Sequence, residues 1–171
     1  ALTAVLVGAG ERGANVYGAW AAAHPADLKI VAVAEPDPVR RAKVAAQHEI
    51  PLQQQFDDWQ PLLNQPQLAD AALICTQDTQ HVAPTLAALQ AGYHVLLEKP
   101  MATTAADCVA LVRAAAQAER QLHVAHVLRY TRHFQTLREI LERGELGQLI
   151  TVDHRENVSW WHMAHSFVRG N

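Results

Sequence analysis

Short apolar runs alternate with amphipathic segments along most of the chain. Five runs predict buried strands, because each is apolar on both faces and rich in Val, Leu, Ile or Ala; they cover residues 3–7, 29–35, 70–76, 93–98 and 122–127. The segments between them predict helices over residues 11–24, 37–48, 57–65, 81–92 and 103–120. Strands that alternate with helices in this way predict an α/β fold with a doubly wound parallel sheet.

Residues typical of helix ends agree with this pattern. Asp37 followed by Pro38 predicts an N-cap and a first helical residue. Thr103 or Thr104 is the expected cap of the helix over residues 103–120, and Gly92 ends the helix before the fourth strand.

The pattern changes after Tyr130. Residues 133–144 predict an amphipathic helix, and residues 148–158 alternate in polarity like a strand. A single strand is not stable in water and leaves an open edge, and no partner for this strand follows. We therefore expect a first domain over residues 1–128, and in residues 129–171 only the beginning of a second, α+β domain.

Composition and charge narrow the possible partners. Half of the residues are apolar and 18% are charged, which is typical of a folded globular chain. The net charge of −3 and the lack of a Lys/Arg run argue against nucleic acid or an anionic membrane as a partner. Cys75 and Cys108 belong to no CxxC pattern, so we expect no disulfide and a reducing cytoplasm. His162 and His165 have i, i+3 spacing but no third ligand in a recognisable pattern, so we expect no metal.

The turn after the first strand reads GAGERG and places Gly8, Gly10 and Gly13 in GxGxxG spacing, with Glu11 and Arg12 between them. Such a turn lets a pyrophosphate approach the backbone at the N-terminus of a helix. The motif is weak alone, and the glycines could simply shape a turn. Here it follows a predicted strand and opens a predicted helix, so we expect it to bind a dinucleotide.

Glu35 stands at the tip of the second strand, where a carboxylate accepts hydrogen bonds from an adenosine ribose. It would also repel a 2′-phosphate, by up to about 4 kcal/mol for like charges ~4 Å apart. NAD is therefore favoured, although Arg40 and Arg41 follow closely and could permit NADP. The alternative is that Glu35 is an ordinary solvent-exposed acid at a strand end.

The fourth strand ends in Glu98, Lys99 and Pro100. Ligands of parallel α/β sheets bind outside the carboxyl ends of the strands. Lys99 could there hydrogen-bond a substrate hydroxyl or help to move its proton, with Glu98 buffering its charge. The alternative is an ordinary exposed ion pair in a loop.

Six segments in this order carry a family resemblance: GAGERG, AEPDP, CTQDTQH, GYHVLLEKPMATT, HVLRYTRHF and WWHMAHSFVRGN. Together they resemble the glucose-fructose oxidoreductase/inositol dehydrogenase/MocA family of NAD(P)-dependent oxidoreductases. The resemblance implies a Rossmann domain over residues 1–128 and the start of a substrate and oligomerisation domain over residues 129–171. It also implies hydride transfer between NAD, or NADP, and a secondary hydroxyl of a sugar or polyol, in a cytoplasmic homo-oligomer.

The resemblance assigns roles to residues at the strand ends. Lys99 is the implied catalytic residue, which contacts both the substrate hydroxyl and the nicotinamide side; Glu98 and Pro100 lie beside it, with a Lys99–Pro100 bond that can be cis. The family's T-P-x-x-x-H segment maps onto Thr76 to His81 near the cofactor, although Gln77 replaces the common proline.

The resemblance leaves the other half of the site outside this sequence. An aspartate and a histidine, four residues apart on a helix of the second domain, usually complete the proton-transfer apparatus, and we expect them beyond Asn171. Arg129, Trp161, His162 and His165 are the candidates for substrate contacts here. Another hypothesis is a non-catalytic dinucleotide-binding module, such as a sensor or a partner-binding protein.

Overall fold

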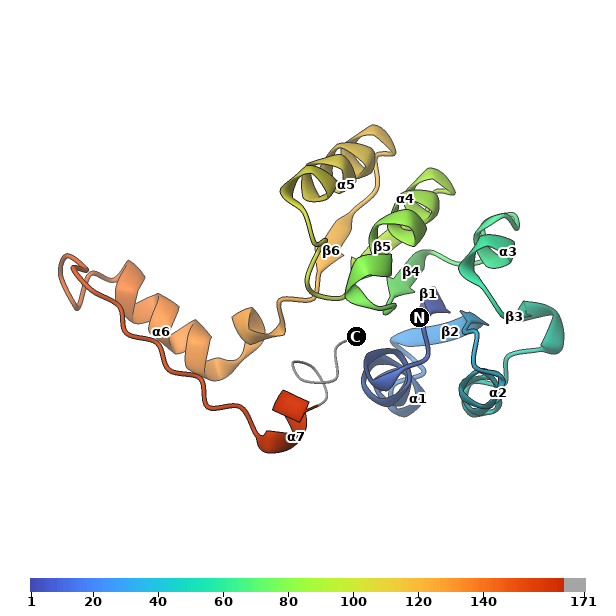
Figure 1. The fold of residues 1–171 in the computed structure, drawn as a ribbon, viewed down its shortest axis with the longest axis horizontal. Helices are drawn as coiled ribbons and strands as arrows, with labels where there is room; N and C mark the ends of the chain where they lie inside the picture. The colour runs from blue at the N-terminus through green and yellow to red at the C-terminus, as the bar shows by residue number, and fades with distance from the viewer. Residues whose placement is uncertain (165–171) are drawn as a thin grey trace. The chain divides into compact units, whose positions relative to one another are not determined.

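A computed structural model describes residues 1–164 of the chain, which divide into one unit up to Ala125 and another from His126. The first unit contains a parallel sheet of six strands in the order β3-β2-β1-β4-β5-β6 (Figure 1). The strands are β1 (Leu2–Val7), β2 (Leu28–Ala34), β3 (Gln55–Phe56), β4 (Ala71–Ile74), β5 (His94–Leu97) and β6 (Leu122–Val124). The prediction of a doubly wound parallel sheet is confirmed.

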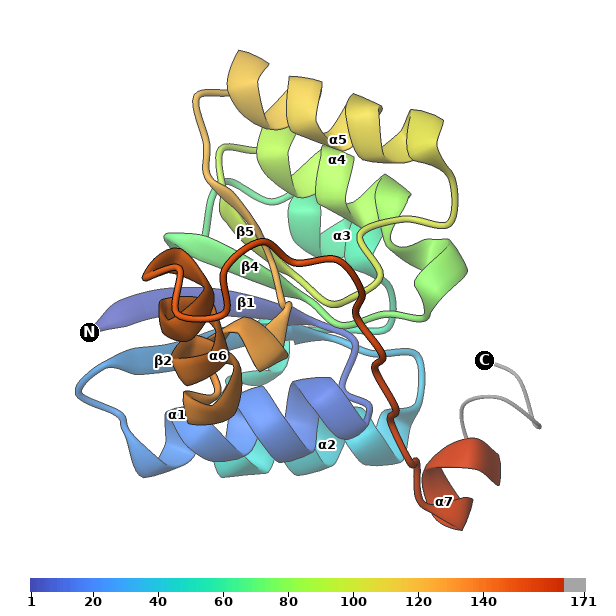
Figure 2. The same cartoon turned by 90° about the vertical axis from the view of Figure 1, so that its left-hand side faces the viewer.

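Helices cover both faces of this sheet (Figure 2). On one side lie α1 (Ala19–Ala23), which continues the π-helical segment Glu11–Gly18, and α2 (Pro38–Gln47). On the other side lie α3 (Trp59–Leu63), α4 (Val82–Gln90) and α5 (Ala105–Gln117). Short 3-10 turns precede β3 at Leu52–Gln54 and α4 at Asp78–Gln80.

Two cores follow from the alternation of side chains along the strands. In β1, Val5 and Val7 face a core that includes Leu62, Leu89 and other residues of α3, α4 and α5. The alternate residues of β1 face a second core with residues of α1 and α2. Because both faces of each central strand are buried, these strands read as continuous apolar runs in the sequence.

The expected helix ends are present. The Asp37 side chain accepts hydrogen bonds from the amides of Val39 and Arg40, and Pro38 is the first helical residue of α2. Thr104, rather than Thr103, caps α5 by accepting from the amide of Asp107. These caps satisfy amides at helix ends that have no partner within the helix.

Two strands differ clearly from the predictions, and the ends of the other four differ by one or two residues. β3 was not predicted, because its two residues are too few to give a periodic signal. β6 ends at Val124 rather than at residue 127, and a 3-10 turn over Val127–Tyr130 follows in the second unit. None of the helices in the described part of the chain is long and apolar enough to cross a bilayer.

The second unit contains α6 (Arg132–Glu142) and α7 (Trp160–Met163). The amphipathic helix predicted for residues 133–144 is therefore confirmed. The strand predicted for residues 148–158 is wrong, since these residues have no regular structure. A strand needs a hydrogen-bonded neighbour, and among the described residues of this unit no other segment forms one.

Candidate cofactor and catalytic site

The site lies at the carboxyl ends of the central strands, where the chain direction around the sheet reverses. β1 has β2 on one side and β4 on the other. In open α/β sheets this reversal leaves a crevice at the carboxyl edge that binds ligands. The turn after β1 and the residues after β2, β4 and β5 all meet at this edge.

The turn after β1 is shaped by Gly8 and Gly13. Gly8 has a φ of +92°, and a Cβ there would lie 2.6 Å from the backbone oxygen of Cys75. A Cβ on Gly13 would lie only 2.0 Å from the Gly8 oxygen. Both glycines are therefore required by the fold itself.

Gly10 is different, because nothing lies within 4 Å of the position that its Cβ would take. Its φ and ψ, −75° and −161°, are open to other residues, so the fold does not require glycine here. The open space lies at the N-terminus of the segment Glu11–Gly18, where backbone amides are available to an anion. This is a cradle that fits a pyrophosphate and that a side chain would fill.

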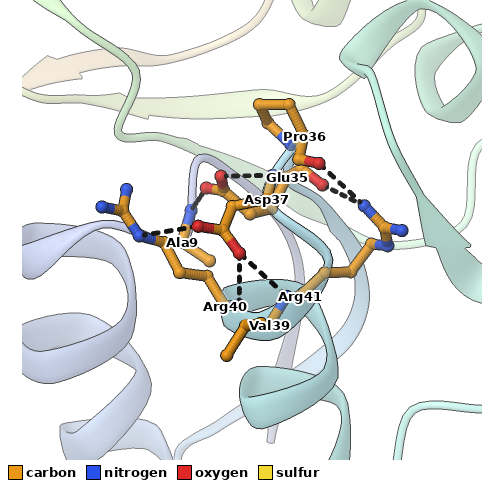
Figure 3. Close-up of polar contacts among 7 residues, drawn as sticks. All are labelled: Ala9, Glu35, Pro36, Asp37, Val39, Arg40 and Arg41. Atoms are coloured by element: carbon orange, nitrogen blue, oxygen red, sulfur yellow. Dashed lines mark hydrogen bonds and ion pairs between the residues drawn. The ribbon is translucent and has the colours of Figure 1, made fainter.

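Glu35 holds this turn against the end of β2 (Figure 3). Its Oε2 accepts a hydrogen bond from the amide of Ala9 at 2.6 Å, and its Oε1 accepts one from the amide of Asp37 at 3.1 Å. The Glu35 residue is 5% exposed. The alternative of an ordinary solvent-exposed acid is therefore wrong.

Arg40 and Arg41 point to opposite sides of this turn (Figure 3). Arg40 Nε lies 3.7 Å from a carboxylate oxygen of Asp37. Arg41 Nη1 donates to the carbonyls of Glu35 and Pro36. Both guanidinium groups thus have partners. The backbone amides of Arg40 and Val39 donate hydrogen bonds to the Asp37 carboxylate, and these bonds hold the pKa of Asp37 below its usual range.

Glu98 is the centre of a second network. It is 4% exposed, and its Oε1 accepts a hydrogen bond from the Tyr17 hydroxyl at 2.6 Å and pairs with Arg12 Nε at 3.3 Å. Its Oε2 accepts from the amide of Lys99 at 3.1 Å. Burial raises the pKa of Tyr17, and the hydrogen bond to Glu98 raises it further.

This network corrects the expectation that Glu98 buffers the charge of Lys99. The carboxylate contacts the Lys99 amide, while its charge is compensated by Arg12, which comes from the glycine-rich segment. The Lys99 side chain is exposed, and its ammonium group has no ion pair or hydrogen bond with any residue that the structure describes. The alternative of an ordinary Glu98–Lys99 ion pair is therefore wrong as well. The Lys99–Pro100 bond is cis.

Thr76 and His81 follow β4. Thr76 borders a cavity, whereas His81 is completely buried, with both ring nitrogens next to backbone carbonyls. His81 therefore offers no exposed atom to a cofactor. Gln77 has a φ of −74°, close to the value that proline imposes. The backbone can therefore follow the same path here although glutamine replaces the family's proline.

A cavity of about 1100 Å³ opens at this edge. Gly8, Pro36 and Thr76 border it from the ends of β1, β2 and β4, and Asp57 and Trp59 border it from the segment after β3. A cavity of this size is large enough for much of a dinucleotide. Sequence reasoning missed Asp57 and Trp59 because it missed β3, and it missed Tyr17 because the sequence carries no signal for its bond to Glu98.

One remaining candidate, Glu11, belongs to the first unit, where it is exposed and accepts a hydrogen bond from Asn15 Nδ2. The others belong to the second unit or lie outside the described residues. Arg129 is exposed in the turn Val127–Tyr130. Trp161 and His162 belong to α7, although their side chains are not among those described, and His165 lies beyond residue 164.

The strand order, the glycine-rich turn at the reversal point and the acid at the end of β2 define a dinucleotide-binding Rossmann domain. Residues 2–126 match the Gfo/Idh/MocA model, which describes an oxidoreductase family with an NAD-binding Rossmann fold. The chain belongs to this family, and the cofactor assignment to NAD(P) is confirmed.

Three similar proteins illustrate the range of the family. Inositol 2-dehydrogenase of Salmonella typhimurium is 31% identical over 101 residues, which are 58% of this chain and 30% of that protein. Trans-1,2-dihydrobenzene-1,2-diol dehydrogenase of Bos taurus is 34% identical over 141 residues, which are 80% of this chain and 40% of that protein. The structure of the WlbA dehydrogenase of Bordetella pertussis with NADH and UDP-GlcNAcA is 28% identical, with a TM-score of 0.77 over 86% of this chain and 41% of that one.

The chain thus spans about 30% to 41% of the length of these relatives. The comparisons cover the cofactor-binding part of such enzymes.

Proposed function

We propose that the protein carrying this chain is an NAD-dependent dehydrogenase that oxidises a secondary hydroxyl of a sugar or polyol. The observation that carries the proposal is the open backbone at Gly10, because glycine there serves no need of the fold but leaves room for a pyrophosphate. The relatives named as inositol and dihydrodiol dehydrogenases support an alcohol as the substrate.

The residues at the sheet edge would have separate roles in binding the cofactor and the substrate. Amides of the Gly10–Gly13 segment bind the pyrophosphate, and Glu35 uses its remaining lone pairs for the adenosine ribose. NAD supplies the hydride acceptor at its nicotinamide ring. Lys99, with its ammonium group exposed next to this edge, orients the substrate hydroxyl and takes part in moving its proton.

Glu35 favours NAD over NADP. A 2′-phosphate would meet the buried carboxylate of Glu35, while Arg40 is paired with Asp37 and Arg41 with backbone carbonyls. Both arginines already have partners, so we expect the repulsion by Glu35 to decide the preference. We expect NADH to bind more tightly than NADPH, and an equal or tighter affinity for NADPH would contradict this preference.

The second unit would carry the rest of the site. We propose that Arg129, Trp161, His162 and His165 contribute to the substrate side, that the protein is a homo-oligomer, and that it works in the cytoplasm. The family resemblance supports each of these assignments.

The test is Lys99→Ala in the gene product as its host makes it, with Lys43→Ala as the control. Lys43 is an exposed lysine in the second half of α2. With NAD⁺ and a panel of polyols that includes myo-inositol, Lys99→Ala should lower turnover by about 100-fold or more with little change in NADH affinity, because a general acid–base group typically contributes this much. Near-normal turnover would rule out this role for Lys99, and NADH binding without any wild-type turnover would favour a non-catalytic module.

A further inference from the structure

His81 connects two loops of the candidate site from a buried position. Its Nδ1 lies 2.6 Å from the carbonyl oxygen of Pro100, and its Nε2 lies 3.1 Å from the carbonyl oxygen of Thr76. The residue is 0% exposed. The ring therefore bridges the loop after β4 and the turn after β5 that carries Lys99. These two segments lie close together because β4 and β5 are neighbours in the sheet.

The backbone of His81 is itself held firmly. His81 is the residue before α4, and its carbonyl accepts hydrogen bonds from the amide and the hydroxyl of Thr85, which is also fully buried. The ring is thus presented from the fixed end of a helix to the turn that carries Lys99.

The turn depends on this contact because proline has no N–H group. The carbonyl is the only hydrogen-bonding group of the Pro100 backbone, and it meets His81 Nδ1. On the other side of Lys99, the amide of Lys99 donates to Glu98. Lys99 is therefore held between two buried side chains that bond its own residue and the next one.

We propose that His81 is a positioning residue for Lys99, acting through an Nδ1–H bond to the Pro100 carbonyl; this role rests on the proposed function of Lys99. A neutral imidazole has one N–H and can donate to only one of the two carbonyls. The shorter contact assigns the proton to Nδ1. The bond to Pro100 therefore sets the position of Lys99, and the contact with Thr76 is secondary.

Two variants separate the two ring nitrogens. In His81→Asn the side-chain amide nitrogen can take the place of Nδ1, and in His81→Gln it can take the place of Nε2. Both lose the aromatic ring, so their losses of packing are similar. The proposal predicts that His81→Asn keeps kcat within about twofold of the wild type, whereas His81→Gln lowers kcat by roughly tenfold to a hundredfold.

A double variant tests whether His81 acts through Lys99. If it does, adding His81→Gln to Lys99→Ala should lower kcat no further than Lys99→Ala alone. The NADH affinity should stay within about threefold throughout, because the pyrophosphate and ribose contacts are unchanged. Equal kcat values for the Asn and Gln variants, or additive losses in the double variant, would overturn the proposal.

A measurement without turnover keeps this inference separate from the proposed function. ¹⁵N NMR of the histidine-labelled gene product reports which ring nitrogen of His81 carries a proton, and His81→Asn identifies the signal by its loss. A proton on Nδ1 supports the proposal, and a neutral ring protonated only on Nε2 overturns it. If no wild-type turnover is found with any polyol, the proposed function fails, and the NMR result still decides whether the bond to Pro100 exists.

Discussion

The glycine-rich turn allows one substitution to be compared with a matched neighbour. A methyl group on Gly13 would lie 2.0 Å from the oxygen of Gly8 and 3.2 Å from Leu6 Cδ1. Because the closest atom belongs to the backbone, no side-chain rotation can relieve the overlap. A methyl group on Gly10 would meet nothing within 4 Å.

The expected magnitudes differ accordingly. Overpacking of a closely packed interior costs about 1–3 kcal/mol, occasionally more, and a backbone clash this short belongs at the upper end. Gly13→Ala should therefore lower the free energy of unfolding by about 3 kcal/mol and Tm by roughly 6–12 °C. For Gly10→Ala, the reduced freedom of the unfolded chain is worth about 0.4–1 kcal/mol and offsets a weaker helix cap, so stability should change by less than about 1 kcal/mol.

Urea unfolding followed by circular dichroism measures both changes, and NADH fluorescence measures binding. Gly10→Ala should fold normally and yet bind NADH at least about tenfold more weakly, which corresponds to about 1.4 kcal/mol. Equal losses of stability in the two variants would refute the division between a glycine needed by the fold and a glycine needed by the ligand. Unchanged NADH binding by Gly10→Ala would refute the proposed pyrophosphate cradle.

Three further predictions concern other parts of the first unit. Tyr17→Phe removes a hydrogen bond to the buried carboxylate of Glu98 and should lower the free energy of unfolding at pH 7 by about 1.5 kcal/mol in urea, the lower end for bonds to charged groups; an unchanged midpoint would contradict this estimate. Burial lowers the pKa of His48 in the folded protein, and its Nε2 has no hydrogen-bond partner among the described residues. As the pH falls below about 6.5, the unfolded chain therefore binds more protons at this residue than the folded protein does. Stability should consequently fall as the pH is lowered from 7 to 5, and His48→Gln should reduce this slope; an unchanged slope would argue against it. Desolvation raises the pKa of the half-buried Cys75 thiol, so iodoacetamide at pH 8 should modify it much more slowly in the folded than in the denatured protein; peptide mass spectrometry measures both rates, and equal rates would contradict this prediction.

The positions of the candidate site residues along the sheet edge followed from the sequence. Apolar runs separated by helices predicted parallel strands, and the carboxyl ends of parallel strands meet at one edge. Glu35, Thr76 and Lys99 each follow such a run, so their arrangement could be inferred without coordinates. The glycine-rich turn was equally predictable from its GxGxxG spacing, although the close approach of the Cys75 backbone to Gly8 was not.

The partners of these residues were decided by the tertiary structure. Glu98 was expected to pair with its neighbour Lys99, but it meets Tyr17, which is 81 residues away in the sequence, and Arg12. His81 was expected near the cofactor and is instead buried between two carbonyls. Such contacts depend on how side chains from adjacent strand ends point toward one another, and no local pattern encodes that direction.

The regular elements show the same division. Sequence periodicity by itself determined the long helices and the central strands, since each of these buries a continuous apolar face along its own length. It did not determine β3 or the state of residues 148–158, because a strand exists only where another strand offers hydrogen bonds. Two residues at Gln55–Phe56 have such a neighbour in β2, and the longer alternating run has none among the described residues.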